Sequence, residues 1–111
     1  MHEMTLDAEY FEKIANGTKT VELRLYDEKR RKIKIGDIIL FSKRGSDARL
    51  RAEVTNLYLA PTFAELLSDG ALLARALPCV GFCEAVELMR RFYTAQEELE
   101  LGTLGIEIKL K

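Results

Sequence analysis

The chain has 111 residues, 48% of them hydrophobic and 32% charged, so we expect residues 1–111 to fold as one globular domain with one core. No apolar run approaches the ~20 residues of a membrane-spanning helix. The N-terminus also lacks the basic segment and apolar stretch of a secretory signal. We therefore expect a cytoplasmic protein with no membrane partner. The chain has only two cysteines, Cys79 and Cys83, which are too few for a disulfide scaffold and lack the second ligand pair of a zinc site. We therefore expect reduced, structural thiols and no metal site. We also expect no cofactor.

The formal net charge of −1 hides an uneven distribution of charge along the chain. Residues 19–51 contain eleven Lys and Arg against five Asp and Glu, whereas the segments before and after them are net acidic. If these basic residues gather on one surface, they create a positive potential that attracts phosphates despite the nearly neutral total. Folding can equally scatter them, and the sequence alone leaves both outcomes open.

The first part of the chain predicts a strand, a helix and a second strand. Alternation over residues 2–6 indicates the first strand, and Asp7 then offers a side-chain oxygen suited to a helix N-cap. Gly17 stands where a helix commonly ends with a left-handed residue, and residues 19–26 follow as the second strand. Three side chains of the helix fall at helical spacing: Tyr10, Phe11 and Ile14.

The second strand combines an aliphatic face with a polar face. Because side chains alternate between the two faces of a strand, one set can enter a core while the other lines the opposite side. With Lys19 at its start, the strand places enough polar groups within ~20 Å of extended chain to build a small polar site. The aliphatic set is Val21, Leu23 and Leu25, and the polar set is Glu22, Arg24 and Tyr26.

The middle of the chain predicts a hairpin. Residues 27–34 are highly charged and indicate a loop, and residues 35–37 have the composition of a turn. Strands over 38–43 and from Leu50 to Leu57 are then joined by the turn-forming residues 44–47, which pairs them as antiparallel neighbours.

The last part of the chain predicts short helices and a closing strand. Capping-box patterns begin helices at Thr62 and Thr94, with further helical segments over 71–77 and 83–92, and alternation over 104–110 indicates the final strand. Apolar patterning places four phenylalanines in the core rather than on a binding surface: Phe11, Phe41, Phe63 and Phe92. About five strands with helices inserted irregularly predict an α+β domain built on a small curved sheet or barrel.

The start of the second strand also carries a recognisable signature. Gly17, Lys19, Glu22 and Arg24 match every fixed position of the pattern G-x-K-x-x-E-x-R, and on these residues the chain resembles the ASCH domain family over its whole length. This resemblance implies a PUA-like β-barrel of about five strands with flanking helices, and a cleft lined by the motif residues. Further matching segments are residues 2–4, 24–30, 35–37 and 102–108.

The resemblance implies that the cleft binds RNA or a modified nucleoside or nucleotide. Lys19 and Arg24 are then expected to meet phosphates or polar base edges, with Arg using its planar fork. Tyr26 is expected to stack on a base, because RNA recognition uses unstacked bases on aromatic planes. Together with Glu22 and Arg30, these residues form the predicted ligand-binding set.

The same family also contains hydrolases, which gives an alternative function. Some relatives remove the acetyl group from N-acetylated cytidine with a lysine, a threonine and a glutamate, and others are metal-assisted ribonucleases. This chain has Lys19, but Glu22 replaces the threonine, and only Glu84 and Glu87 are available as the later glutamate. An enzyme at this cleft is expected to use Lys19 and Glu22 as its catalytic residues, although Glu22 also tends to keep Lys19 charged.

Structural and interaction roles remain open beside these functions. Charges at alternate strand positions commonly form salt bridges on a solvent-facing surface, and the basic run over 29–34 is most simply a solvated loop. A protein-interaction module is the third alternative. His2 has no partner at metal-ligand spacing, and Cys83 has only His2 as a candidate base, so neither predicts a metal site or a nucleophile.

Overall fold

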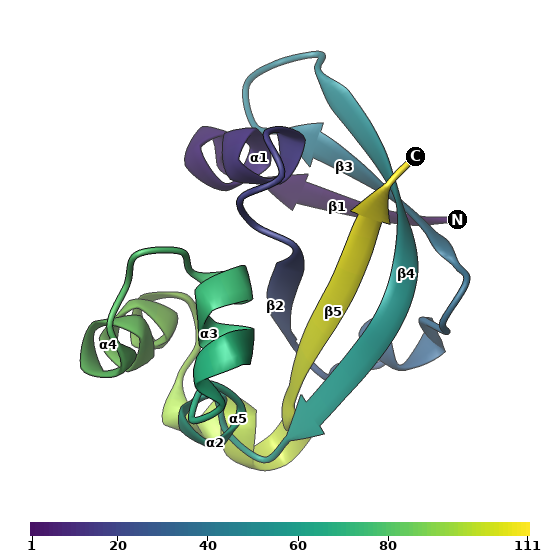
Figure 1. The fold of residues 1–111 in the computed structure, drawn as a ribbon. Coiled ribbons are helices and arrows are strands. Elements are labelled where there is room, and N and C mark those ends of the chain that lie inside the picture. The colour runs from purple at the N-terminus through teal and green to yellow at the C-terminus, as the bar shows by residue number, and fades with distance from the viewer.

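The computed structural model describes residues 1–111 and contains one five-stranded sheet. The strands lie in the order β1-β3-β4-β5-β2, with β1 parallel to β3 and the other neighbours antiparallel. The sheet curls into a half-barrel whose edge strands, β1 and β2, do not pair (Figure 1). This confirms the predicted α+β fold on a small curved sheet. The strands are β1 (His2–Leu6), β2 (Val21–Leu25), β3 (Ile38–Lys43), β4 (Arg49–Ala60) and β5 (Thr103–Leu110).

Helices lie on both sides of the unpaired edge of β2. In Figure 1, α1 lies above β2 and the group of helices between β4 and β5 lies beside and below it. None of the helices is long and apolar enough to cross a membrane. The helices are α1 (Ala8–Ala15), the short 3-10 helix η1 (Arg30–Lys32), α2 (Phe63–Leu66), α3 (Gly70–Ala76), α4 (Phe82–Phe92) and α5 (Ala95–Leu101).

Two buried apolar clusters hold these layers together. In the first, Phe41 of β3 packs with Phe11 and other side chains from α1 and the sheet. In the second, the aliphatic side chains of β2 pack against α2, α3 and α4, with Phe63 and Leu67 almost fully buried. The alternation along β2 therefore directs its aliphatic face toward the second cluster, as the sequence predicts.

The hairpin and the helix caps follow the sequence patterns closely. β3 and β4 pair as antiparallel neighbours on either side of the predicted turn. Thr62 accepts a hydrogen bond from the Glu65 N–H, and Thr94 forms a complete capping box with Glu97. β2 is shorter than expected and covers only Val21–Leu25, because the preceding residue donates its N–H to α3 instead.

Two expectations about burial are wrong. Phe92 was expected in the core but is 49% exposed, because α4 buries Ala85 and Met89 and turns its last residue toward a cavity. Cys79 and Cys83 are free thiols as expected, but both are exposed and neither packs in the core. Apolar periodicity locates the helix correctly but does not fix which of its sides meets the sheet.

Candidate functional site

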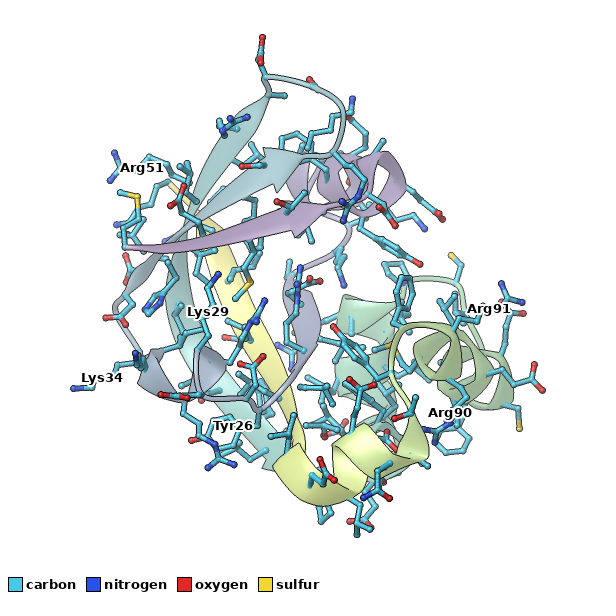
Figure 2. The ribbon with its side chains drawn as sticks, turned by 180° about the vertical axis from the view of Figure 1, so that it is seen from behind. Tyr26, Lys29, Lys34, Arg51, Arg90 and Arg91 are labelled. Carbon is cyan, nitrogen blue, oxygen red and sulfur yellow. The ribbon has the colours of Figure 1, made fainter.

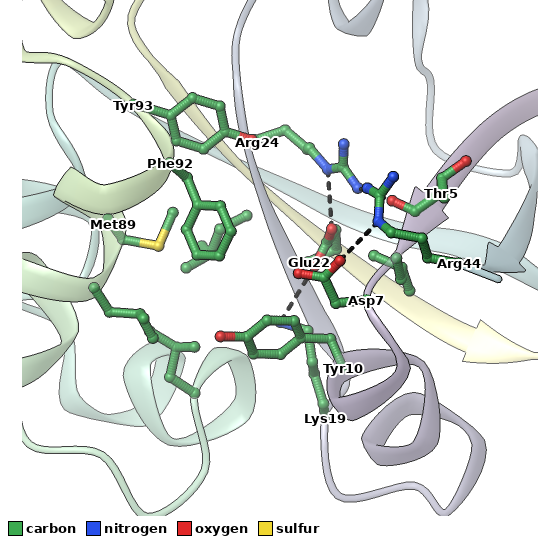
Figure 3. Close-up of a pocket in the computed structure, with 14 residues that line it drawn as sticks. Thr5, Asp7, Tyr10, Lys19, Glu22, Arg24, Arg44, Met89, Phe92 and Tyr93 are labelled. Carbon is green, nitrogen blue, oxygen red and sulfur yellow. Dashed lines mark hydrogen bonds and ion pairs between the residues drawn. The ribbon is translucent and has the colours of Figure 1, made fainter.

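A pocket lies along the unpaired edge of β2, where the two apolar clusters meet. Its wall on one side comes from β1 and α1, and on the other side from α4 and from Leu77, which follows α3 (Figure 3). The cavity has a volume of about 130 Å³ and is open to solvent on one side. Lys19, Glu22 and Arg24 all line it, so the structure brings together three of the predicted site residues. The polar face of β2 therefore turns toward a hollow and not toward a convex surface.

Lys19 is buried at the base of this pocket, with 3% of its surface exposed. Gly17 takes φ +84° and ends α1, so that the chain turns back and the Lys19 N–H donates to the Lys13 carbonyl. Lys19 Nζ donates to the carbonyl oxygens of Val21 at 2.8 Å and Ala76 at 2.7 Å. Its third neighbour is Glu22, so the three donors of the ammonium group are all engaged within the protein.

Glu22 connects the two cations of the motif. One carboxylate oxygen lies 3.3 Å from Lys19 Nζ, and the other accepts a hydrogen bond of 2.9 Å from Arg24 Nε. Only 6% of Glu22 is exposed, and each of its two carboxylate oxygens faces one of the cations. Two positive charges against one leave the floor of the pocket with a net positive charge.

Arg24 also joins the two edges of the half-barrel. Its Nη2 donates to the carbonyl oxygen of Thr5, on β1, at 3.1 Å. Since β1 and β2 share no ladder, this side chain crosses the seam between them and closes one end of the pocket. The guanidinium group remains accessible from the pocket, because the side chain is 17% exposed.

Burial shifts the protonation equilibrium of Lys19. Desolvation lowers the pKa of Lys19 below its ordinary value, while the Glu22 carboxylate raises it through charge and a hydrogen bond. The charges of Arg24 and Lys13 add to the lowering. The amine is therefore easier to deprotonate than an exposed lysine, although its hydrogen bonds are those of an ammonium group.

Aromatic rings form the upper walls of the pocket. Tyr10 of α1 meets Phe92 of α4 edge-on, with ring centroids 6.4 Å apart. Tyr93 follows Phe92 and stacks on the buried Phe63 at 5.4 Å, which fixes its orientation. Burial raises the pKa of both tyrosines, so their hydroxyl groups stay protonated at neutral pH and can donate hydrogen bonds. The pocket thus combines a charged floor with flat apolar walls.

An exposed ion pair stands at the mouth of the pocket. Asp7 Oδ1 accepts a hydrogen bond of 2.8 Å from Arg44 Nε, and both residues line the cavity. Asp7 occupies the N-cap position of α1 as expected, but its side chain makes no capping hydrogen bond. Its carboxylate faces Arg44 on the turn between β3 and β4 instead.

Tyr26 and Arg30, which were predicted to bind the ligand, lie outside the pocket lining. Tyr26 packs partly buried against the first apolar cluster, with the guanidinium of Arg31 4.3 Å from its ring centroid. Arg30 pairs with Asp27 at 3.0 Å, and its buried Nε has no acceptor. Neither of these two residues therefore contributes to the lining of the pocket.

The remaining sequence candidates lie away from this pocket. Glu84 and Glu87 are exposed on α4 and do not line the cavity. His2 pairs with Asp37 at 2.8 Å, and no group of three His, Cys, Asp or Glu side chains is placed to hold a metal ion.

Sequence reasoning missed the aromatic walls and the mouth of the pocket. Tyr10 was recognised only as part of a helix face, and Phe92 was assigned to the core. Asp7 was recognised only as an N-cap and Arg44 only as part of a turn, and Tyr93 carried no pattern. All three reach the site only through the arrangement of α1, α4 and the β3–β4 turn around β2. The one available signal was the pair of adjacent aromatic residues that ends α4.

A second polar cluster lies on another side of α3. Glu107 of β5 accepts hydrogen bonds from Arg75 Nη1 at 2.5 Å, Tyr58 at 2.8 Å and Thr55 at 2.7 Å. The pairing of β4 with β5 shifts register between Val54 and Asn56, next to Thr55. Hydrogen bonds from Thr55, Tyr58 and Arg75 lower the pKa of Glu107, so its carboxylate is ionised at neutral pH. The cluster fastens α3 to the sheet beside Lys19.

The chain is similar to two solved structures of PUA-like architecture. The crystal structure of hypothetical protein PH0355 has a TM-score of 0.87 and 40% sequence identity, covering 98% of this chain and 97% of that one. The solution NMR structure of protein PF0455 from Pyrococcus furiosus has a TM-score of 0.74 and 36% identity, covering 98% and 96%. No curated protein matches the chain. The model of the ASCH domain matches residues 4–110, and this match over nearly the whole length shows that the chain belongs to the ASCH domain family.

Proposed function

We propose that the protein binds RNA and takes an unstacked base or nucleotide into the β2 pocket. The observation that carries this proposal is the convergence of Lys19, Glu22 and Arg24 beneath aromatic walls. Unstacked bases in RNA complexes are held by aromatic or guanidinium planes and by polar groups along their edges, and the pocket offers both. Its volume of about 130 Å³ is close to the roughly 150 Å³ that accommodates a single benzene ring, so it suits one planar ring.

Basic side chains near the pocket support contact with the phosphate backbone. Lys29 and Lys34 are exposed and make no ion pair, and they lie to one side in Figure 2, with Arg91 of α4 on the other. The unpaired charges of these side chains give this part of the surface a local positive potential, although the whole chain carries a net charge of −1.

The hydrogen bonding of Lys19 favours binding over catalysis. A lysine nucleophile needs a free lone pair, whereas the three donors of Lys19 are directed to two carbonyl oxygens and Glu22. Arg24 retains donors that face the cavity, and Glu22 retains acceptor capacity. A ligand therefore meets Arg24 and Glu22 directly, while Lys19 supports Glu22 from beneath.

Replacing Phe92 with alanine tests the role of the aromatic wall. We expect Phe92→Ala to weaken binding of a fluorescent single-stranded RNA about tenfold, because base stacking on an aromatic ring contributes about 1–3 kcal/mol. Phe82→Ala is the matched control, because Phe82 lies on the same helix, is similarly exposed and does not line the pocket. Fluorescence anisotropy measures both. Equal affinities of the two variants, or no binding by the wild-type protein, would contradict the proposal.

Hydrolysis of the amide bond in N-acetylated cytidine is a second candidate function. The lowered pKa of Lys19 in a solvent-open pocket favours it, because a partly desolvated amine can accept a proton during attack by water. Incubation of the protein with N-acetylated cytidine, with release of acetate as the readout, tests this candidate. Turnover that persists in Lys19→Ala, or no turnover at all, counts against it.

A further inference from the structure

We propose that Arg44 and Arg24 form a phosphate subsite at the mouth of the pocket, so that the ligand is a nucleotide and not a nucleoside. This inference rests on the proposed RNA-binding function and adds a recognition element to the same site. Arg44 belongs to the turn between β3 and β4 and lies outside the family signature.

Both arginines converge on the end of β1 and on Asp7, the residue that links β1 to α1. Arg24 Nη2 donates to the carbonyl oxygen of Thr5, and the backbone N–H of Arg44 donates to the carbonyl oxygen of Leu6 at 2.8 Å. The Arg44 side chain then reaches Asp7, the next residue of that segment. Figure 3 accordingly shows the two guanidinium groups near each other, at the side of the pocket opposite Tyr93 and Phe92.

The two arginines differ in how firmly their present partners hold them. Arg24 is bound to a buried carboxylate that it shares with Lys19, so its position is fixed and its charge is only partly balanced. The side chains of Arg44 and Asp7 are 66% and 49% exposed, and exposed ion pairs of this kind stabilise little and exchange readily. A phosphate between the guanidinium groups gains charge-assisted hydrogen bonds from both, with Arg44 leaving Asp7 to meet it.

Asp7 has an alternative partner once Arg44 turns to a phosphate. It occupies the N-cap position of α1, where an aspartate side chain commonly accepts hydrogen bonds from the first-turn N–H groups. In this structure the carboxylate makes no such bond, because it faces Arg44. Phosphate binding therefore lets Asp7 cap α1, which offsets the loss of its ion pair. Until then its negative charge at the mouth opposes an incoming phosphate.

The test compares uridine with its 5′- and 3′-monophosphates by calorimetry at fixed, low salt. We expect the wild-type protein to bind at least one monophosphate about tenfold more tightly than uridine, and Arg44→Gln to remove that difference while changing uridine affinity less than about twofold. Lys43→Gln is the matched control, because Lys43 is the neighbouring residue, pairs with Glu12 at 2.7 Å and does not line the pocket.

The Asp7 variant gives a change in the opposite direction. Asp7→Asn keeps a side chain that can cap α1 but removes the competing charge, so we expect monophosphate affinity to rise about threefold. Glu9→Gln, which removes a charge on the same helix outside the pocket, is expected to leave it unchanged.

The outcomes separate this inference from the proposed function. Equal wild-type affinity for uridine and both monophosphates, or equal behaviour of Arg44→Gln and Lys43→Gln, overturns the phosphate subsite while RNA oligonucleotide binding still stands. Failure of the wild-type protein to bind oligonucleotides and monophosphates alike overturns both.

Discussion

At the floor of the pocket, one glutamate is the counterion for two cations from its own segment. Glu22 lies between Lys19 and Arg24, and the three side chains are largely buried. A buried ion pair contributes little net stability compared with apolar packing, but removing one partner leaves an uncompensated buried charge. The three charges therefore fix the relative positions of these side chains more than they add to the stability of the fold.

Neutralising Glu22 is expected to destabilise the fold through its two cations. Glu22→Gln keeps the size of the side chain but leaves Lys19 and Arg24 without a counterion, so we expect the free energy of unfolding to fall by about 3 kcal/mol. Urea denaturation measures this loss. In the double variant Lys19→Met/Glu22→Gln the buried ammonium is gone, and the loss is expected to be smaller than the sum of the two single losses.

The matched control for this prediction is Glu12→Gln. Glu12 pairs with Lys43 at 2.7 Å, but both side chains are partly exposed, so the expected cost is below about 1 kcal/mol. A loss in Glu22→Gln no larger than that in Glu12→Gln would show that burial of the motif charges is unimportant.

At the scale of elements, α3 is held in place by hydrogen bonds to the residues that precede β2 and to a side chain of β5. Its last residue, Ala76, accepts a hydrogen bond from Lys19 Nζ, and the carbonyl oxygen of Arg75 accepts one from the N–H of Thr20. The Arg75 side chain meanwhile extends to Glu107 on β5, which pairs with β2. The polar cluster around Glu107 therefore positions the carbonyl group that holds the amine of Lys19.

The contribution of Glu107 is expected to depend on pH. Since hydrogen bonds from Thr55, Tyr58 and Arg75 lower the pKa of Glu107, its stabilisation is present above the ordinary glutamate pKa and is lost as pH falls through the lowered value. We therefore expect Glu107→Gln to lower the free energy of unfolding by about 1–2 kcal/mol at pH 7. The difference in unfolding free energy between this variant and the wild type is expected to shrink in acid. Urea titrations across that pH range measure it. A difference in unfolding free energy that stays constant with pH contradicts a stabilising role of the Glu107 carboxylate. Glu28→Gln, at an exposed position, serves as the control.

Element patterns predicted one wall of the pocket but not the others. Alternation along β2 placed Glu22 and Arg24 on one face, and the glycine at position 17 placed the end of α1, because both signals are local. The aromatic walls depend on α1 and α4 meeting across the seam, which follows from β1 and β2 being the two unpaired edges of the sheet. Strand order is set by contacts between distant segments, so Phe92 and Arg44 could not be assigned from the sequence.

At the scale of the whole molecule, the charge segregation seen along the sequence persists on the surface. Arg30 and Arg44 are paired with acidic groups, but Lys29, Lys32 and Lys34 are exposed and make no ion pair. The basic segment is thus neither fully scattered nor fully neutralised. It leaves free cations in the segment that follows Tyr26, and Figure 2 shows Lys29 and Lys34 on one side of the molecule.

The salt dependence of RNA binding reports whether these free cations contact phosphates. Each phosphate neutralised on single-stranded RNA releases counterions and steepens the slope of log affinity against log salt by about 0.7. If Lys29 and Lys34 each contact one phosphate, replacing both with glutamine lowers the magnitude of the slope by about 1.4 and weakens binding most at low salt. The control replaces Lys13 and Lys43, which pair with Glu9 and Glu12, and is expected to keep the wild-type slope. An unchanged slope in the first variant would mean that the loop stays solvated and that the phosphate contacts lie at the pocket itself.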